Sequence, residues 1–395
     1  MRRSAVSTTS QILARAWLLA AVASLLLPTS VRLGWWLPLH LALAGAAASA
    51  VAGAAPEFAA ALSAGRLDRW SWVPLALLTV GAALIAVGFP AGVDALVATG
   101  GAVVGLGGLA LARTEWTAWR SGINRRHRPI AMLYVFAAAC PTAGAALGAL
   151  LGTGAVSGDA YVAVRRAHVA LNLLGFLTLT IVATTVLLIP TVLRVRAPSW
   201  DPRLPFASLA AGLTVSAVGF AVDLRPIAAL GAAAYAFGAL EVLSMAVLAL
   251  RRRSEHAERA ASMHLIASLS WLAVGSVSWA AAAAAGGIDT RLLALVSVFA
   301  IGVVVQALLG AWSHLLPMAS LGGPDVHRRL LARADRFAIP QVAVYNVGTA
   351  LLTAAAGGWL PAVFGSRAIV SIAVVAVVVI VKTSGGTVRG AARSV

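Results

Sequence analysis

Two histidines in apolar stretches of this sequence have the chemistry of metal ligands. His40 lies in the run WWLPLHLALAG, and His168 begins the run HVALNLLGFLTLT. A neutral imidazole is a common axial ligand of haem iron and a good ligand of copper. Asn172 follows His168 by four residues, so both side chains share one face of a helix. The pattern indicates a metal pocket; the alternative is that both histidines only hydrogen-bond to backbone or water.

Two arginines, Arg165 and Arg166, come shortly before His168 and are placed to anchor an anionic cofactor. A guanidinium group binds carboxylates through charge-assisted hydrogen bonds. The carboxylates of a haem are its propionates, so arginines beside a histidine ligand are suited to bind the propionates. The sequence therefore predicts one cofactor-binding set, made of His40, His168, Arg165, Arg166 and Asn172.

The elements that must position these residues are membrane-spanning helices. The chain has 395 residues, of which 61% are hydrophobic and 11% charged, and its mean hydropathy is +0.92. Apolar runs of about 20 residues recur along its whole length, which is typical of transmembrane helices. No linker separates them, so we expect a single all-α membrane domain over 1–395, with about twelve spans. The predicted spans are 12–30, 35–55, 71–90, 93–112, 129–152, 167–190, 205–222, 226–250, 262–285, 292–316, 339–357 and 368–386.

The basic residues predict the orientation of the spans. With the N-terminus inside, 24 of the 30 Lys and Arg residues fall in inner segments and six in outer ones. This asymmetry predicts cytoplasmic N- and C-termini. It also accounts for the net charge of +17 without nucleic acid, which we do not expect as a partner. The longer inner loops, 113–129 and 318–340, are expected to be partly helical at the membrane surface.

The topology separates the polar residues by depth. It places His40 and His168 in the outer part of the membrane, and His264 and His314 near the inner ends of their spans. The bilayer core is about 30 Å thick, so one metal cannot be bound at both faces. His314 is a further ligand candidate, close enough in depth to meet His264. Cys140 is the single cysteine, so it forms no internal disulfide.

Two further polar residues interrupt the apolar runs. Glu241 and Gln306 are candidates for a proton relay, because carboxyl groups within membrane spans often carry protons. The competing interpretation is that both only form hydrogen bonds that hold helices together.

Three segments resemble a known group of membrane proteins. They are HLALAG (40–45), HVALNLLGF (168–176) and QALLGAWSHLLP (306–317). These segments resemble motifs of bacterial membrane proteins of the NnrS type and of membrane regions joined to copper-oxidase domains in actinobacteria. Both groups are similar to the catalytic subunit of haem-copper oxidases. The likeness extends over residues 35–350 in scattered motifs.

The resemblance implies a twelve-span protein of an actinobacterial inner (cytoplasmic) membrane that binds haem b, with copper as a further candidate. It implies redox or nitric-oxide chemistry and a redox partner at the outer face. His40 and His168 match histidines of the family pattern. Other positions depart from it: Glu57 and Ala170 stand where family motifs carry further histidines, and 205–222 contains none. The binuclear-site pattern is therefore incomplete.

Two other functions are compatible with the sequence. The first is a proton-coupled secondary transporter in which Glu241 is the coupling carboxylate, because twelve spans with both termini inside also describe many carriers. The second is an assembly subunit without chemistry of its own. In every case we expect contact with the lipid bilayer, while the oligomeric state stays open.

Overall fold

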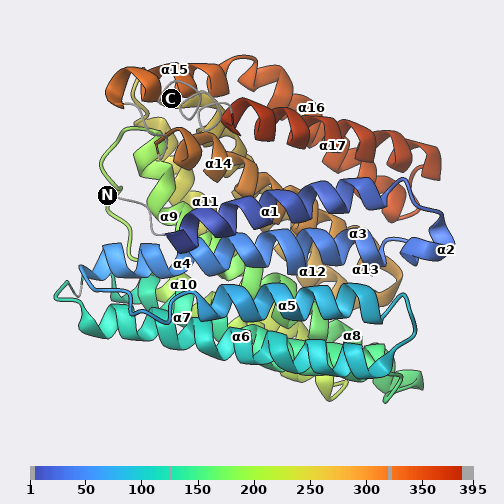
Figure 1. The fold of residues 1–395 in the computed structure, drawn as a ribbon. Coiled ribbons are helices and arrows are strands. Elements are labelled where there is room, and N and C mark those ends of the chain that lie inside the picture. Colours follow the sequence, from blue (N-terminus) through green and yellow to red (C-terminus); the bar gives the residue numbers. More distant parts are fainter. Residues whose placement is uncertain (1–4, 125, 319–322, 385–395) are drawn as a thin grey trace, which may run out of the picture. The chain divides into compact units, whose positions relative to one another are not determined.

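The computed structural model describes residues 5–124, 126–318 and 323–384, and this part of the chain is helical without strands (Figure 1). Helices satisfy every backbone hydrogen bond within one segment, which an apolar environment requires. The all-α prediction is confirmed. Some basic residues used to predict the topology lie outside the described residues: Arg2, Arg3, Arg125, Arg389 and Arg393.

The helices follow one another with short connections, and three π-helical segments (η1–η3) interrupt them. In chain order they are α1 (Ala5–Ser24), α2 (Thr29–Arg32), α3 (Trp36–His40), η1 (Leu41–Ala47), α4 (Ala48–Ser63), α5 (Val73–Gly88), α6 (Asp94–Ser121), α7 (Arg128–Gly152), α8 (Gly158–Val169), η2 (Ala170–Thr178), α9 (Leu179–Val192), α10 (Arg203–Ala221), α11 (Arg225–Arg251), α12 (Arg259–Ala285), α13 (Ile288–Ser297), η3 (Val298–Val305), α14 (Gln306–Met318), α15 (Gly323–Asp335), α16 (Ala338–Ala356) and α17 (Ala362–Ser384).

Ten helices of the described residues are long and apolar enough to cross a membrane. A shorter apolar helix, Val73–Gly88, adds to them. The chain is therefore a multi-pass membrane protein, in contact with lipid. The count of twelve spans and the cytoplasmic position of both termini stay predictions. The ten helices are Trp36–Ser63, Asp94–Ser121, Arg128–Gly152, Gly158–Val192, Arg203–Ala221, Arg225–Arg251, Arg259–Ala285, Ile288–Met318, Ala338–Ala356 and Ala362–Thr383.

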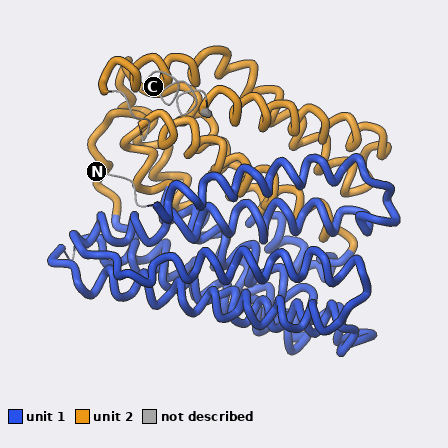
Figure 2. Tube along the Cα trace, in the orientation of Figure 1, with its two compact units in different colours: residues 1–184, 201–239, 276–289 blue, residues 185–200, 240–275, 290–395 orange. Residues whose placement is uncertain are grey.

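The chain divides into two compact units (Figure 2). Unit 1 comprises residues 1–184, 201–239 and 276–289, coloured blue. Unit 2 comprises residues 185–200, 240–275 and 290–395, coloured orange. His40 and His168 belong to unit 1, whereas His314 belongs to unit 2.

A tight reversal in unit 1 brings α8 back along α7. Gly154 and Gly158 between the two helices have φ angles of +67° and +58°, a left-handed conformation that favours glycine. Because the chain reverses here, the C-terminal part of α8 and the segment η2 lie beside the C-terminal half of α7. This arrangement positions His168 against the small residues of α7.

The π-helical segments lie next to candidate site residues. The segment η1 starts directly after His40, η2 starts two residues after His168, and η3 ends directly before Gln306. Such segments occur frequently at functional sites. The position of all three therefore supports the choice of these residues as candidates.

Hydroxyl groups of neighbouring helices satisfy carbonyl groups of the π-helical segments. In unit 1, Tyr235 Oη donates to the Leu174 carbonyl of η2 at 3.0 Å. In unit 2, Tyr345 Oη donates to the Ile301 carbonyl of η3 at 2.9 Å. A widened helical turn leaves carbonyls without a regular partner, and a buried carbonyl without a hydrogen bond is costly. The tyrosines therefore stabilise these segments.

Replacing Tyr345 with phenylalanine should lower the free energy of unfolding by about 1–3 kcal/mol, because a buried acceptor loses its donor. Thermal unfolding in detergent or nanodiscs measures this change. Tyr161→Phe is the control, since Tyr161 is 38% exposed. Equal stability of the Tyr345→Phe variant and the wild type would show that the hydroxyl does not support η3.

Candidate functional site

The His168 side chain is held against α7 by its Nδ1 atom. This atom lies 2.8 Å from the Gly144 carbonyl oxygen. A carbonyl only accepts, so Nδ1 carries the proton and Nε2 keeps a free lone pair. Asn172 Nδ2 donates to the His168 carbonyl oxygen at 3.0 Å. The predicted pairing of Asn172 and His168 on one helix face is therefore present.

Two glycines of α7 make the space that His168 and Asn172 fill. A Cβ atom at Gly148 would lie 2.6 Å from His168 Cε1, and one at Gly144 would lie 2.4 Å from Asn172 Nδ2. Both distances are shorter than a non-bonded contact allows. Glycine is thus required at both positions for these side chains to pack as they do.

His40 is held in the same tautomer within its own helix. Its Nδ1 lies 2.8 Å from the Trp36 carbonyl oxygen, so Nε2 again keeps the lone pair. The imidazole also stacks on the Trp36 ring, with ring centroids 4.1 Å apart. The segments η1 and η2, which follow the two histidines, contact each other. His40 and His168 therefore stand beside neighbouring segments of unit 1.

Arg165 and Arg166 bind carboxylates of unit 1. Arg166 donates from Nε to Asp289 Oδ2 at 3.0 Å and from Nη1 to Asp223 Oδ1 at 3.0 Å. Arg165 Nη2 lies 3.3 Å from Asp289 Oδ1. The two arginines are thus positioned by acidic partners. An anionic group of a cofactor would have to bind arginines that already pair with these aspartates.

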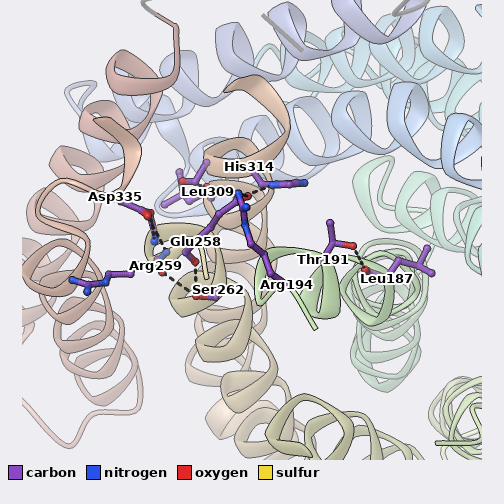
Figure 3. Close-up of polar contacts among 11 residues, drawn as sticks. Leu187, Thr191, Arg194, Glu258, Arg259, Ser262, Leu309, His314 and Asp335 are labelled. Carbon is purple, nitrogen blue, oxygen red and sulfur yellow. Dashed lines mark hydrogen bonds and ion pairs between the residues drawn. The ribbon is translucent and has the colours of Figure 1, made fainter. Parts of the chain in front are cut away.

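In unit 2, His314 forms a buried pair with a carboxylate (Figure 3). His314 Nδ1 lies 2.7 Å from Glu258 Oε2, and the two side chains are 9% and 8% exposed. Arg194 approaches the other carboxylate oxygen, with Nη2 3.9 Å from Oε1. The helix α12 starts directly after Glu258, and its first two backbone amides, of Arg259 and Ala260, donate hydrogen bonds to Asp335. An imidazole oriented by a carboxylate is typical of metal ligands and of general bases.

His264 and His314 have different partners. His264 is fully buried, and its Nε2 lies 3.4 Å from Gln341 Nε2. Lys382 Nζ donates to Gln341 Oε1 at 2.9 Å, which orients that amide so that its NH₂ group faces His264. The hydrogen bonds therefore place His264 in a network of its own and His314 with Glu258.

The two relay candidates differ in burial and in partners. Gln306 is fully buried, and its Nε2 donates to Asn346 Oδ1 at 3.3 Å. Trp271 Nε1 donates to the same oxygen at 2.7 Å. Glu241 is half-buried on α11, and no described side chain hydrogen-bonds to its carboxylate. The hydrogen bonds of the described residues do not connect Glu241 with Gln306.

Sequence reasoning missed two buried glutamates. Glu258 stands directly before α12. Acidic residues are common at helix starts, and this is the sequence signal that could have identified it. Glu115 was assigned to the loop 113–129, but α6 continues through Ser121 and buries it. No local signal pairs Glu258 with His314, because 56 residues separate them.

No family model matches the chain, and no curated protein is significantly similar to it. Within the described residues, no group of three or more His, Cys, Asp or Glu side chains is arranged to hold a metal ion.

Proposed function

We propose that the protein binds haem through His40 and His168 and handles redox equivalents or nitric oxide in the membrane. The observation that carries this proposal is that both imidazoles make the same kind of hydrogen bond. His40 directly precedes η1 and His168 stands two residues before η2, the two π-helical segments of unit 1 that contact each other. Each imidazole donates Nδ1–H to a backbone carbonyl. This hydrogen bond orients a ring and leaves Nε2 as the ligand atom, as in most histidine ligands of metals.

The surrounding residues fit a haem at the level of donor chemistry. Bound haem would supply one-electron chemistry and a binding position for a diatomic gas. Within the protein, the Gly144 carbonyl holds His168, Asn172 fixes the adjacent turn, and Arg165 and Arg166 offer positive charge to propionates. The same Nε2 atoms suit copper, so we propose copper as the alternative metal.

The membrane context completes the proposal. We infer twelve spans with both termini on the cytoplasmic side of the inner membrane, because the basic residues are concentrated in the segments that this orientation places inside. His40 and His168 then face the outer half of the membrane, where a redox partner would bind. The likeness to NnrS-type and actinobacterial proteins supports this proposal, and the missing histidines favour a haem-binding protein over an oxygen-reducing pump.

The test is the absorption spectrum of the purified protein. We expect a reduced-minus-oxidised haem spectrum from wild type expressed with added haem, and pyridine extraction counts the haem. His168→Ala and His40→Ala should each lose most of this signal, because an axial ligand is removed. His256→Ala is the control, since the His256 side chain is 71% exposed.

Metal analysis separates the outcomes. Wild-type protein that contains copper but no haem would favour the copper alternative at the same ligands. A folded preparation with neither haem nor copper would overturn the proposal. Proton-coupled uptake that is lost in Glu241→Gln would then support the transporter, and its absence would leave an assembly subunit.

A further inference from the structure

The packing of α6 against α7 in unit 1 places Glu115 opposite Tyr134. The two helices run antiparallel and approach closely at glycines: a Cβ at Gly101 would lie 2.9 Å from Ala149 Cβ, and one at Gly108 would lie 2.8 Å from Pro141 Cγ. Glu115 is two helical turns beyond Gly108, on the same face. Tyr134 is two turns before Pro141, so the register brings both residues to the same level.

One carboxylate oxygen of Glu115 is buried without a hydrogen-bond partner among the described residues. The residue is 1% exposed, and its Oε2 atom accepts no hydrogen bond from any described residue. It belongs to one of the ten candidate membrane spans. An ionised carboxylate in such a place is very costly unless a cation or several donors accompany it. Burial therefore favours the protonated, neutral carboxyl group.

No described cation neutralises Glu115. On α6 itself, Arg113 pairs with Asp68 and Arg120 points over the Trp116 ring. The neighbouring helix α5 contains no titratable residue. The helix α4 contains one titratable residue, Glu57, which has a partner of its own. The titratable residues of α7 are Arg128, Tyr134 and Cys140.

Tyr134 is a hydrogen-bond donor on the helix that faces Glu115. It is fully buried, and its Oη lies 2.8 Å from Thr184 Oγ1. Thr184 Oγ1 itself donates to the Thr180 carbonyl oxygen at 2.8 Å, so Tyr134 is the donor in the pair. Transfer of this donor from Thr184 to an ionised Glu115 would require the two side chains to move towards each other.

We propose that Glu115 is a reversible proton-binding site inside unit 1. It holds a proton on its carboxyl group at neutral pH. When that proton passes to water, the carboxylate accepts the hydrogen bond of Tyr134, and Thr184 loses it. This site is independent of the metal ligands, and its ligand is the proton.

Infrared difference spectroscopy of the whole protein in nanodiscs tests the site. We expect a carbonyl band of a protonated carboxylic acid at neutral pH that disappears in Glu115→Gln. The matched control, Glu241→Gln, should retain it, because Glu241 is half-buried on another helix. In Tyr134→Phe the band should persist about one to two pH units further into alkali, because the ionised form loses a donor.

Other outcomes would overturn the proposal. A band that is absent from wild type, or unchanged in Glu115→Gln, contradicts proton binding at Glu115. An unshifted titration in Tyr134→Phe contradicts the role of Tyr134. If Glu115→Gln does not fold, a hydrophobic carbodiimide that modifies protonated carboxyl groups replaces it. Peptide mapping of wild type should then find the label on Glu115, and its absence there would also contradict the site.

Discussion

Replacing Glu258 with alanine is expected to lower the free energy of unfolding by about 1–3 kcal/mol, the usual cost of leaving a buried hydrogen-bonding group without its partner. The variant leaves His314 Nδ1 without its acceptor in a site where both side chains are less than a tenth exposed. It also removes the carboxylate that faces Arg194. Equilibrium unfolding in bicelles or nanodiscs measures the change.

Two variants control this prediction. Glu255→Ala should change stability little, because the Glu255 side chain is 86% exposed. Glu258→Gln should lose less than Glu258→Ala, because an amide oxygen still accepts the hydrogen bond of His314. Equal losses in Glu258→Ala and Glu255→Ala would mean that the pair contributes nothing specific to unit 2.

Replacing Gly148 with alanine is expected to displace His168 and, if His168 binds haem, to remove most of the haem. The new Cβ would lie 2.6 Å from His168 Cε1, so the imidazole would have to move away from the Gly144 carbonyl. Overpacking of this kind also costs about 1–3 kcal/mol of stability. Haem content and thermal unfolding of the purified variant give both readouts.

Gly105→Ala is the matched control for this substitution. Gly105 lies on α6 and faces α7. A Cβ atom at Gly105 would be 3.5 Å from the nearest atom, the Thr142 carbonyl oxygen. We expect normal haem content and nearly normal stability. A Gly148→Ala variant that keeps both its haem and its stability would show that His168 does not need this glycine.

The sequence by itself determined the membrane class and the local geometry of the site. Apolar runs of membrane-spanning length predict helices because the backbone must satisfy its own hydrogen bonds in lipid. The four-residue spacing of His168 and Asn172 predicted their shared face, and the structure has a hydrogen bond between them. Such features depend on neighbouring residues in one helix, so they can be read from spacing.

Tertiary structure decided which polar groups meet. Arg166 binds Asp289 across 123 residues, and His314 binds Glu258 across 56. Glu115 became buried because α6 extends beyond the predicted end of its span. These contacts depend on the order, rotation and length of packed helices. Hydropathy encodes how deep a residue lies in the membrane but not which neighbour it faces, so the partners appear only in the folded chain.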